Sequence, residues 1–197
     1  MNTALLVMDV QQGIVERYAD GGPVVDRVVA ALAAAREADL PAIFVRVAFR
    51  PGYPDVSPRN RSFATIAGSG SDRFTEQSSG TQLHPALDRR PSEAVVVKKR
   101  VSAFTGSDLE VLLRSSGIDH LVLAGIATSG VVLSTVREAA DRDYQLTVLA
   151  DACADADPEV HQVLVGKVFP RQAEVIAVDD WARRVAGSAG SADSAGA

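Results

Sequence analysis

The chain has 197 residues, of which 47% are hydrophobic and 23% are charged, so it can bury the core of one α/β domain and is neither disordered nor fibrous in composition. Its formal net charge of −5 and its short basic clusters leave no basic face for nucleic acid. A single cysteine, no signal-peptide pattern and no apolar run near the roughly 18 residues of a membrane span lead us to expect a cytoplasmic protein without membrane contact.

Apolar runs of strand length alternate along the chain with stretches of helical spacing, which is typical of a parallel sheet covered by helices on both faces. The predicted strands are Thr3–Asp9, Ala42–Val47, Ala94–Val97, His120–Ala124, Leu146–Ala150 and Val175–Val178. The predicted helices are Pro23–Ala38, Ser107–Ser115, Ser129–Asp143, Pro158–Val168 and Asp180–Val185. Because parallel strands are joined by right-handed crossovers, we expect a three-layer α/β/α fold of Rossmann-like type with a mostly parallel sheet.

Two segments interrupt this alternation. Arg50–Arg90 is too long for a connection between a strand and a helix, is rich in Gly, Pro, Ser and Arg, and follows a strand end, so we interpret it as a lid or substrate loop. Gly187–Ala197 contains too little apolar surface to offset its ordering entropy, and we expect a mobile tail there. Residues 1–186 would then form a single domain.

Residues with chemical potential follow three of the predicted strands. Asp9 ends the first strand, Lys98 follows the third, and a turn from Gly125 through Thr128 to Val131 follows the fourth. The carboxyl ends of neighbouring parallel strands line one crevice, so these residues should converge although they are far apart in sequence. A carboxylate and an ammonium in a partly dry crevice shift each other's pKa and can hold, give or take a proton.

These blocks resemble those of the isochorismatase-like, or cysteine hydrolase, superfamily, and the resemblance extends over nearly the whole chain. Asp9 and Gln11 match the Asp-x-Gln start of that family, and residues 98–104 match its Lys-x-x-x-Ser-Ala-Phe block. The turn that begins at Gly125 matches a Gly-x-x-Thr-x-x-Cys-Val pattern, except that Val131 stands where the family has its nucleophilic cysteine. The chain therefore resembles a hydrolase scaffold without the usual nucleophile.

The resemblance implies a role for each matching residue. Asp9 would give or take a proton, Lys98 would be its electrostatic partner, and the backbone N–H groups of Ala127 and Val131 would form an anion-binding hole. The family also places a cis peptide bond in this turn, which maps onto Ile126–Ala127. Self-association as a homodimer or homotetramer is implied in the same way.

Loss of the thiol leaves two functions open. Members of the superfamily that lack the cysteine cleave an enol ether with the aspartate as general acid, a reaction that needs no nucleophilic side chain. We therefore expect a hydrolase of a small, anionic metabolite that uses no cofactor. The alternative is a pseudoenzyme that binds a small molecule without turnover. Val131 discriminates between them, because binding is favoured if it fills the crevice and hydrolysis if it leaves room for water.

Other nucleophiles and a metal site have weaker support. Ser129 and Ser134 flank the substituted position without replacing it in register, and no histidine that could activate them is nearby in the sequence. Cys153 is interpreted as a small buried hydrophobic residue. The interval between the second strand and Lys98 contains only His84, which falls short of a metal ligand set, so no metal is expected.

Arginines dominate the predicted lid. Arg46 and Arg50, at the end of the second strand, are the best placed to pair with a substrate carboxylate. For each arginine taken singly, a guanidinium exposed to solvent is about equally compatible with the sequence. Gln11 and Phe104, which belong to the matching blocks, complete the predicted substrate-binding set.

Overall fold

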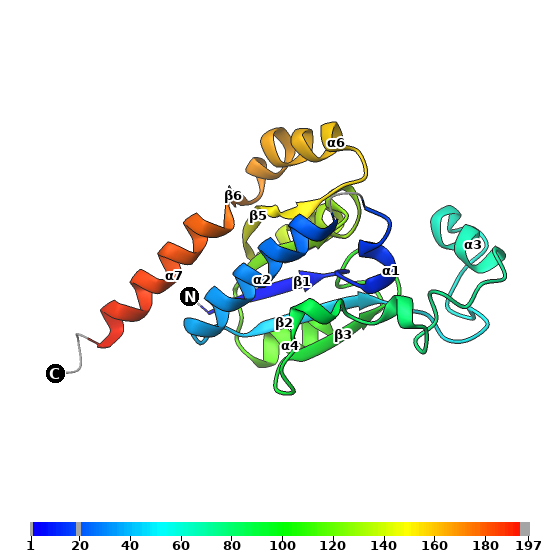
Figure 1. The fold of residues 1–197 in the computed structure, drawn as a ribbon, viewed down its shortest axis with the longest axis horizontal. Coiled ribbons are helices and arrows are strands. Elements are labelled where there is room, and N and C mark those ends of the chain that lie inside the picture. The colour runs from blue at the N-terminus through cyan, green and yellow to red at the C-terminus, as the bar shows by residue number, and fades with distance from the viewer. Residues whose placement is uncertain (1, 19–20, 194–197) are drawn as a thin grey trace.

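The computed structural model describes residues 2–18 and 21–193. Six parallel strands form one sheet in the order β3-β2-β1-β4-β5-β6 (Figure 1). The strands are β1 (Thr3–Met8), β2 (Ala42–Val47), β3 (Ala94–Lys98), β4 (His120–Ile126), β5 (Gln145–Ala154) and β6 (Glu174–Ile176). The predicted parallel sheet of a three-layer α/β/α fold is confirmed.

Helices cover both faces of this sheet. The α-helices described are α1 (Gln12–Val15), α2 (Gly21–Glu37), α3 (Arg61–Gly68), α4 (Leu109–Ser115), α5 (Leu133–Ala140), α6 (Pro158–Val163) and α7 (Val178–Asp193), of which α3 lies apart from the sheet. Buried side chains of α1, α2 and α7 share one core cluster with one face of the sheet. Buried side chains of α4, α5 and the turns after α6 share a second cluster with the opposite face.

The central strand β1 shows how the sequence produces two cores. Its residues 4–8 are fully buried, and alternate side chains enter opposite clusters, with Leu6 and Met8 on one face and Leu5 and Val7 on the other. β1 pairs with both β2 and β4, so the strand order reverses beside it. In doubly wound sheets, ligands bind at this reversal, outside the carboxyl ends of the strands.

Two predicted helices are interrupted by wider turns. The helix predicted at Ser129–Asp143 begins as a π-helical turn over Thr128–Val132, in which Gly130 has non-helical dihedral angles, and only then continues as α5. The helix predicted at Pro158–Val168 consists of α6 and a π-helical turn over Leu164–Val168. Hydrophobic periodicity located both segments and did not detect the change in hydrogen-bond spacing.

The segment Arg50–Arg90 is more ordered than a loop. It contains α3 and short 3₁₀ turns at Ser79–Thr81 and Pro85–Leu87. A small apolar cluster of Val47, Phe49, Tyr53, Phe63 and Phe74 attaches it to the end of β2. Figure 1 shows α3 at the opposite end of the molecule from α7. The cluster is built from aromatic residues scattered over the segment, so it has no periodic signature in the sequence.

The C-terminal helix is longer than predicted. α7 continues through residues 187–193, the first part of the segment for which the sequence predicts a mobile tail, whereas residues 194–197 lie outside the described residues. The mobility of this segment stays a prediction. Its first turns are attached to the core by the buried side chains of Val178 and Trp181. A helix that is already nucleated adds residues at low cost, which permits this extension although it contains Gly187 and Gly190. None of the helices described is long and apolar enough to cross a membrane.

Candidate active site

Asp9 and Lys98 form a buried ion pair at the carboxyl ends of β1 and β3. Lys98 Nζ lies 2.8 Å from Asp9 Oδ2, and the two side chains are only 1% and 8% exposed. β2 separates the two strands in the sheet, and its Val47 pairs with Lys98 while Val45 pairs with Met8. The long lysine side chain therefore spans the end of β2 to reach the carboxylate.

All three protons of the Lys98 ammonium have acceptors. Besides Asp9, Nζ donates to the backbone carbonyl oxygens of Arg100 at 3.0 Å and Val101 at 2.9 Å. Lysine has three donors and no acceptor, so this set uses its full capacity. Lys98 is therefore held in one position and orients the carboxyl group of Asp9.

One oxygen of Asp9 lacks such a partner. Asp9 Oδ1 is buried and has no hydrogen-bond partner among the described residues. Burial raises the pKa of Asp9 above its usual value, although the charge of Lys98 acts to lower it. A raised pKa favours the protonated carboxyl, and the free oxygen can carry the proton, which is the property that a general acid requires.

The turn after β4 brings backbone groups to the same place. Gly125 has φ of +149°, and a Cβ atom there would lie 2.1 Å from the carbonyl oxygen of Met8, so only glycine fits beside β1. The peptide bond Ile126–Ala127 is cis, as the resemblance implied. The N–H of Ala127 has no intramolecular acceptor among the described residues. The side chain of Thr128 points elsewhere, with Oγ1 at 2.9 Å from Nδ1 of His161.

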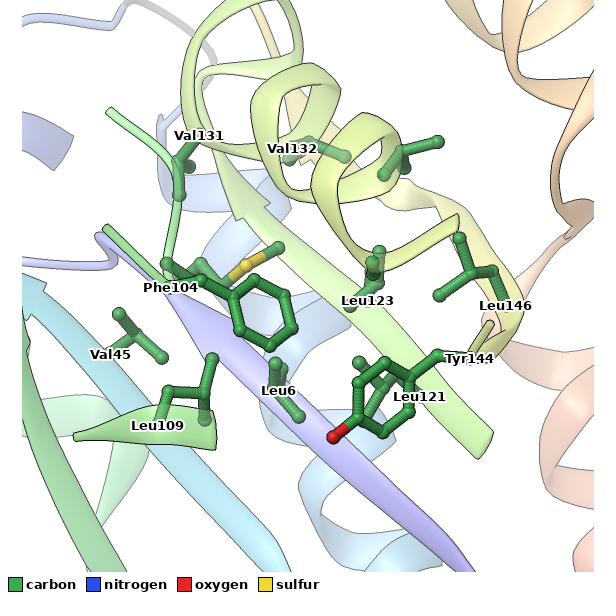
Figure 2. Close-up of a cluster of buried hydrophobic side chains, with 14 of the residues drawn as sticks. Leu6, Val45, Phe104, Leu109, Leu121, Leu123, Val131, Val132, Tyr144 and Leu146 are labelled. Carbon is green, nitrogen blue, oxygen red and sulfur yellow. The ribbon is translucent and has the colours of Figure 1, made fainter. Parts of the chain in front are cut away.

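Val131 lies at the boundary between the core and the site. It is 2% exposed and belongs to the core cluster that includes Val132 and Phe104, and Figure 2 shows it near one end of the side chains drawn. It also lines the same cavity as Asp9 and Lys98. An apolar side chain therefore occupies part of the wall at the position where the resemblance places a nucleophile.

The only thiol of the chain is not a substitute nucleophile. Cys153 is buried in β5, and burial raises its pKa to about 12. The thiolate is the nucleophilic form of cysteine, so this group is unreactive near neutral pH. Among the described residues, no three His, Cys, Asp or Glu side chains are grouped as metal ligands.

A cavity of about 220 Å³ opens in front of the ion pair, and we call it the Asp9 pocket. It is lined by Asp9, Ile14, Arg17, Tyr18, Val47, Phe63, Phe74, Lys98, Val101, Ile126, Ala127, Gly130 and Val131. Pockets for drug-sized ligands are typically about 300–1,000 Å³, so this one suits a smaller molecule. Its walls are mostly apolar, and its polar groups are concentrated at the ion pair and at Arg17 and Tyr18.

Arg17 and Tyr18 are pocket residues that no sequence pattern predicted. They lie just beyond Glu16, the C-cap of α1, and the four residues of α1 are too few for a hydrophobic period. The guanidinium of Arg17 lies over the ring of Phe74, 5.0 Å from its centroid. Burial and the negative charge of Asp155 raise the pKa of Tyr18. The position of Arg17, six residues after Gln11 of the Asp-x-Gln block, is the one feature of the sequence that could have indicated a pocket residue here.

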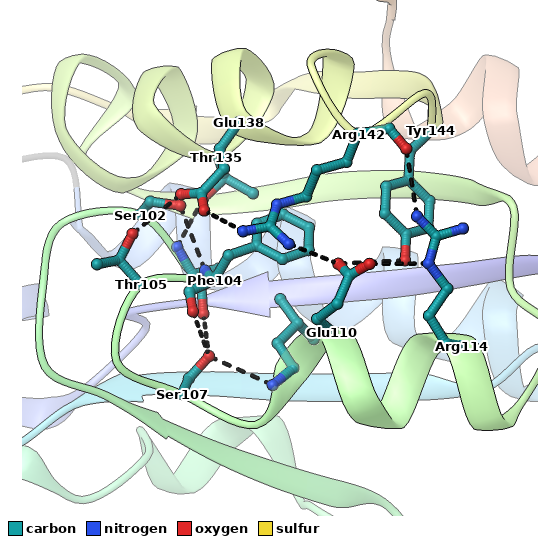
Figure 3. A network of polar contacts seen from close by, with 12 residues as sticks. Ser102, Phe104, Thr105, Ser107, Glu110, Arg114, Thr135, Glu138, Arg142 and Tyr144 are labelled. Atoms are coloured by element: carbon teal, nitrogen blue, oxygen red, sulfur yellow. Dashed lines mark hydrogen bonds and ion pairs between the residues drawn. The ribbon is translucent and has the colours of Figure 1, made fainter.

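Two residues predicted to bind substrate, Gln11 and Phe104, lie outside the Asp9 pocket. Gln11 is fully buried, and its amide joins the end of β2 to residue 81 by donating to Val47 O at 3.0 Å and Thr81 O at 2.9 Å and accepting from Val47 N at 2.8 Å. Phe104 is buried in the core 6.0 Å from the ring of Tyr144, and Arg142 covers it at 4.8 Å (Figure 3). Neither residue lines the Asp9 pocket.

The two predicted lid arginines also lie outside the Asp9 pocket. Arg46 donates to Thr81 O at 3.2 Å and lines a separate hollow with His84 and Arg89. Arg50 is 64% exposed and forms an ion pair with Asp55. The lid contributes its aromatic residues Phe63 and Phe74 to the pocket instead.

Comparison with known proteins identifies a family. The isochorismatase domain matches the chain over residues 3–180. The isochorismatase family protein YecD of Escherichia coli O157:H7 is 34% identical over 184 residues, covering 90% of this chain and 93% of that protein. The ureidoacrylate amidohydrolase RutB of Pseudomonas syringae pv. syringae is 34% identical over 180 residues, covering 81% and 74%. An isochorismatase family structure from Burkholderia thailandensis has a TM-score of 0.78 at 32% identity, covering 91% and 93%.

Proposed function

The chain belongs to the isochorismatase family, whose members are hydrolases, and we propose that it hydrolyses a small anionic metabolite by acid–base chemistry of Asp9 without a cysteine nucleophile. The reacting bond would be the C–O bond of an enol ether or an amide-type C–N bond. The observation that carries the proposal is the buried Oδ1 of Asp9, which has no hydrogen-bond partner among the described residues. Asp9 lines the pocket, and the pKa of its carboxyl group is raised.

Each group in the pocket has a role in the enol ether reaction. Protonated Asp9 would give its proton to the vinyl carbon, which leaves an oxocarbenium ion in the substrate. A water molecule would then add to the oxocarbenium carbon and return a proton to Asp9, and collapse of the resulting hemiketal would release a carbonyl compound and an alcohol. Lys98 would hold Asp9 in position and stabilise it once it has become negative.

Backbone groups would complete the site. The N–H of Ala127, which has no intramolecular acceptor among the described residues, and the N–H of Val131 would bind an anionic oxygen of the substrate. For an amide-type bond, water would attack the carbonyl carbon with Asp9 as the base. RutB, a relative at 34% identity, is an amidohydrolase, which supports keeping the C–N bond as a candidate.

A pseudoenzyme that binds a small molecule is the second candidate. Val131 favours it, because this apolar side chain belongs to the pocket wall beside the ion pair and narrows the space for an attacking water. The hydrolase and the pseudoenzyme therefore differ in whether water reaches the bound molecule. An experiment that measures turnover distinguishes the two candidates.

The test is turnover of a panel of enol ethers, amides and N-carbamoyl compounds by the wild type and by Asp9→Asn. We expect Asp9→Asn to abolish hydrolysis and to retain the fold by circular dichroism, because the amide keeps the shape and loses the proton. If Asp9 is the general acid, wild-type turnover falls as the pH rises through its raised pKa, since only the protonated form is active. Unchanged turnover in Asp9→Asn would remove Asp9 from the mechanism, and no turnover by the wild type would favour the pseudoenzyme.

A further inference from the structure

Arg17 lies at the Asp9 pocket without an oppositely charged partner among the described residues. It is an exposed residue that lines the pocket, and its guanidinium lies over the face of Phe74, another pocket residue. Among the described residues it has no ion pair and no side-chain hydrogen bond. Stacking on an aromatic ring restricts the orientation of the guanidinium and leaves its N–H donors free for a ligand.

The two lysines at the end of β3 are already paired. Lys98 is saturated by Asp9 and two carbonyl oxygens. Lys99 Nζ lies 2.6 Å from Glu76 Oε1 and donates to the Ala48 carbonyl at 2.7 Å. The three N–H donors of Lys98 are all used by protein oxygen atoms, so the cationic group of the pocket whose donors are unused among the described residues is the Arg17 guanidinium.

Tyr18 adds a neutral donor beside this charge. Its hydroxyl has no hydrogen-bond partner among the described residues, and its raised pKa keeps it protonated at neutral pH. Between these polar groups and the ion pair, the pocket wall is apolar. The side chains that form this part of the wall are Ile14, Val47, Phe63, Phe74, Val101, Ile126 and Val131.

We propose that Arg17 determines substrate specificity by binding a carboxylate at one end of a small apolar substrate, with Tyr18 as a second donor, while the reacting bond lies at Asp9. A planar guanidinium matches the two oxygens of a carboxylate, and an apolar body of the substrate would contact the aromatic wall. The proposal rests on the proposed function for its reacting end. It makes a separate claim about binding, which is measurable without turnover.

The test uses matched ligands that differ only in charge. Crotonate and benzoate are compared with crotonamide and benzamide by NMR titration of the wild type, Arg17→Gln and Arg17→Lys. Arg61→Gln is the control, since Arg61 is an exposed arginine on α3 outside the pocket and its loss changes the net charge equally. We expect the wild type to prefer each acid over its amide by roughly tenfold, the worth of one charge-assisted hydrogen bond.

In Arg17→Gln this preference should fall to less than about twofold, Arg17→Lys should keep part of it, and Arg61→Gln should keep all of it. The proposal is overturned if the wild type binds neither acid or shows no preference, if Arg17→Gln keeps the preference, or if Arg61→Gln loses it equally. Should Arg17→Gln not fold, an undiminished preference in Arg17→Lys overturns it. The two proposals fail separately, because turnover of Asp9→Asn tests the reacting end alone, whereas the acid preference of Arg17→Gln, measured without turnover, tests Arg17 alone.

Discussion

At the scale of single residues, the site depends on a lysine that carries a charge inside the protein. The Lys98 side chain is 1% exposed, and its charge is tolerated there because three oxygen atoms accept its protons. Two of these acceptors are backbone carbonyls that follow the lysine by two and three residues, so the chain after β3 folds back around its own side chain. Removing one partner of such a pair leaves the other charge buried and uncompensated.

We predict that Lys98→Met destabilises the protein by about 3–5 kcal/mol at neutral pH. Without the cation, the pKa of Asp9 rises further. A carboxyl with a raised pKa in the folded state destabilises the fold increasingly as the pH rises above its unfolded value of 3.8. The difference in the free energy of unfolding between the wild type and Lys98→Met should therefore decrease as the pH falls toward that value. Urea unfolding at several pH values measures this difference.

Lys99→Met is the matched control for this experiment. Lys99 pairs with Glu76, whose side chain is 42% exposed, so its loss should cost only about 0.2–1 kcal/mol. Equal losses in the two variants, or a Lys98→Met deficit that does not change with pH, would contradict the view that Lys98 neutralises a buried carboxylate.

A thiol introduced at residue 131 tests whether Val131 occupies the family's nucleophile position. In Val131→Cys the sulfur would line the Asp9 pocket near the Lys98 ammonium, so its pKa should fall below the roughly 8.5 of a free cysteine. We predict rapid alkylation by iodoacetamide near neutral pH, followed by mass spectrometry. The exchange should cost on the order of 1 kcal/mol, because the two side chains are similar in size.

Two internal references accompany this variant. Cys153 should remain unlabelled in the native protein, because burial raises its pKa to about 12. Val132→Cys places a thiol one residue further along, at a fully buried position of the core that does not line the pocket, and should also label slowly. Labelling of the residue-131 thiol no faster than that of the residue-132 thiol would show that Val131 is not accessible from the pocket.

At the scale of elements, the close approach of β1 and β4 defines the site. Met8 pairs with Gly125 at the ends of these strands, and Asp9 and the turn through Val131 begin directly after this pair. The contact is so close that any side chain at residue 125 would meet the backbone of β1. Glycine is therefore required by packing between two strands, in addition to its positive φ.

Gly125→Ala should destabilise the protein by on the order of 3 kcal/mol or more, because β1 and β4 must separate to admit the methyl group. Gly166→Ala is the control, since a Cβ there has no neighbour within 4 Å and Gly166 lies in a helical turn. Its effect should stay within about 0.5 kcal/mol. Denaturant unfolding measures both variants, and similar midpoints would refute the packing argument.

At the scale of the whole molecule, the protein combines two large cores with one small cluster. The large clusters cover the two faces of the sheet, and β1 and β4 contribute to both. The part of the lid around α3 is attached mainly by the five-residue cluster around Phe49 and Phe63, whereas Leu87, near the end of the lid, belongs to one of the large clusters. A segment with so few buried apolar contacts should open without global unfolding.

We predict two classes of amide protection in native-state hydrogen exchange. Amides of β1 and β4 should exchange only through global unfolding, whereas those of α3 should exchange through an opening of lower free energy. Phe63→Ala should lower the protection of both α3 and β1, because its contacts are lost in the local opening and in global unfolding. Leu6→Ala, in the main core, should lower the protection of β1 and leave α3 nearly unchanged, because the core stays intact when the lid opens. An equal loss of protection in α3 and β1 in Leu6→Ala would show that the lid unfolds together with the sheet.

The sequence alone identified the strands, their parallel arrangement and the convergence of Asp9, Lys98 and the turn after Gly125. These features are local. A continuously apolar run predicts a strand buried on both faces, and the residue after it must lie at the carboxyl edge of the sheet. The position of such a residue is fixed by chain direction, so no knowledge of distant contacts was needed.

The tertiary structure alone decided which neighbouring side chains face the pocket. Gln11 turns inward because backbone groups of Val47 and Thr81, far away in sequence, bind its amide. Arg46 lines another hollow, and Arg17 reaches the pocket because Phe74 of the lid stacks against it. The direction of a side chain depends on partners brought together by folding, and these long-range contacts leave no periodic pattern in the sequence.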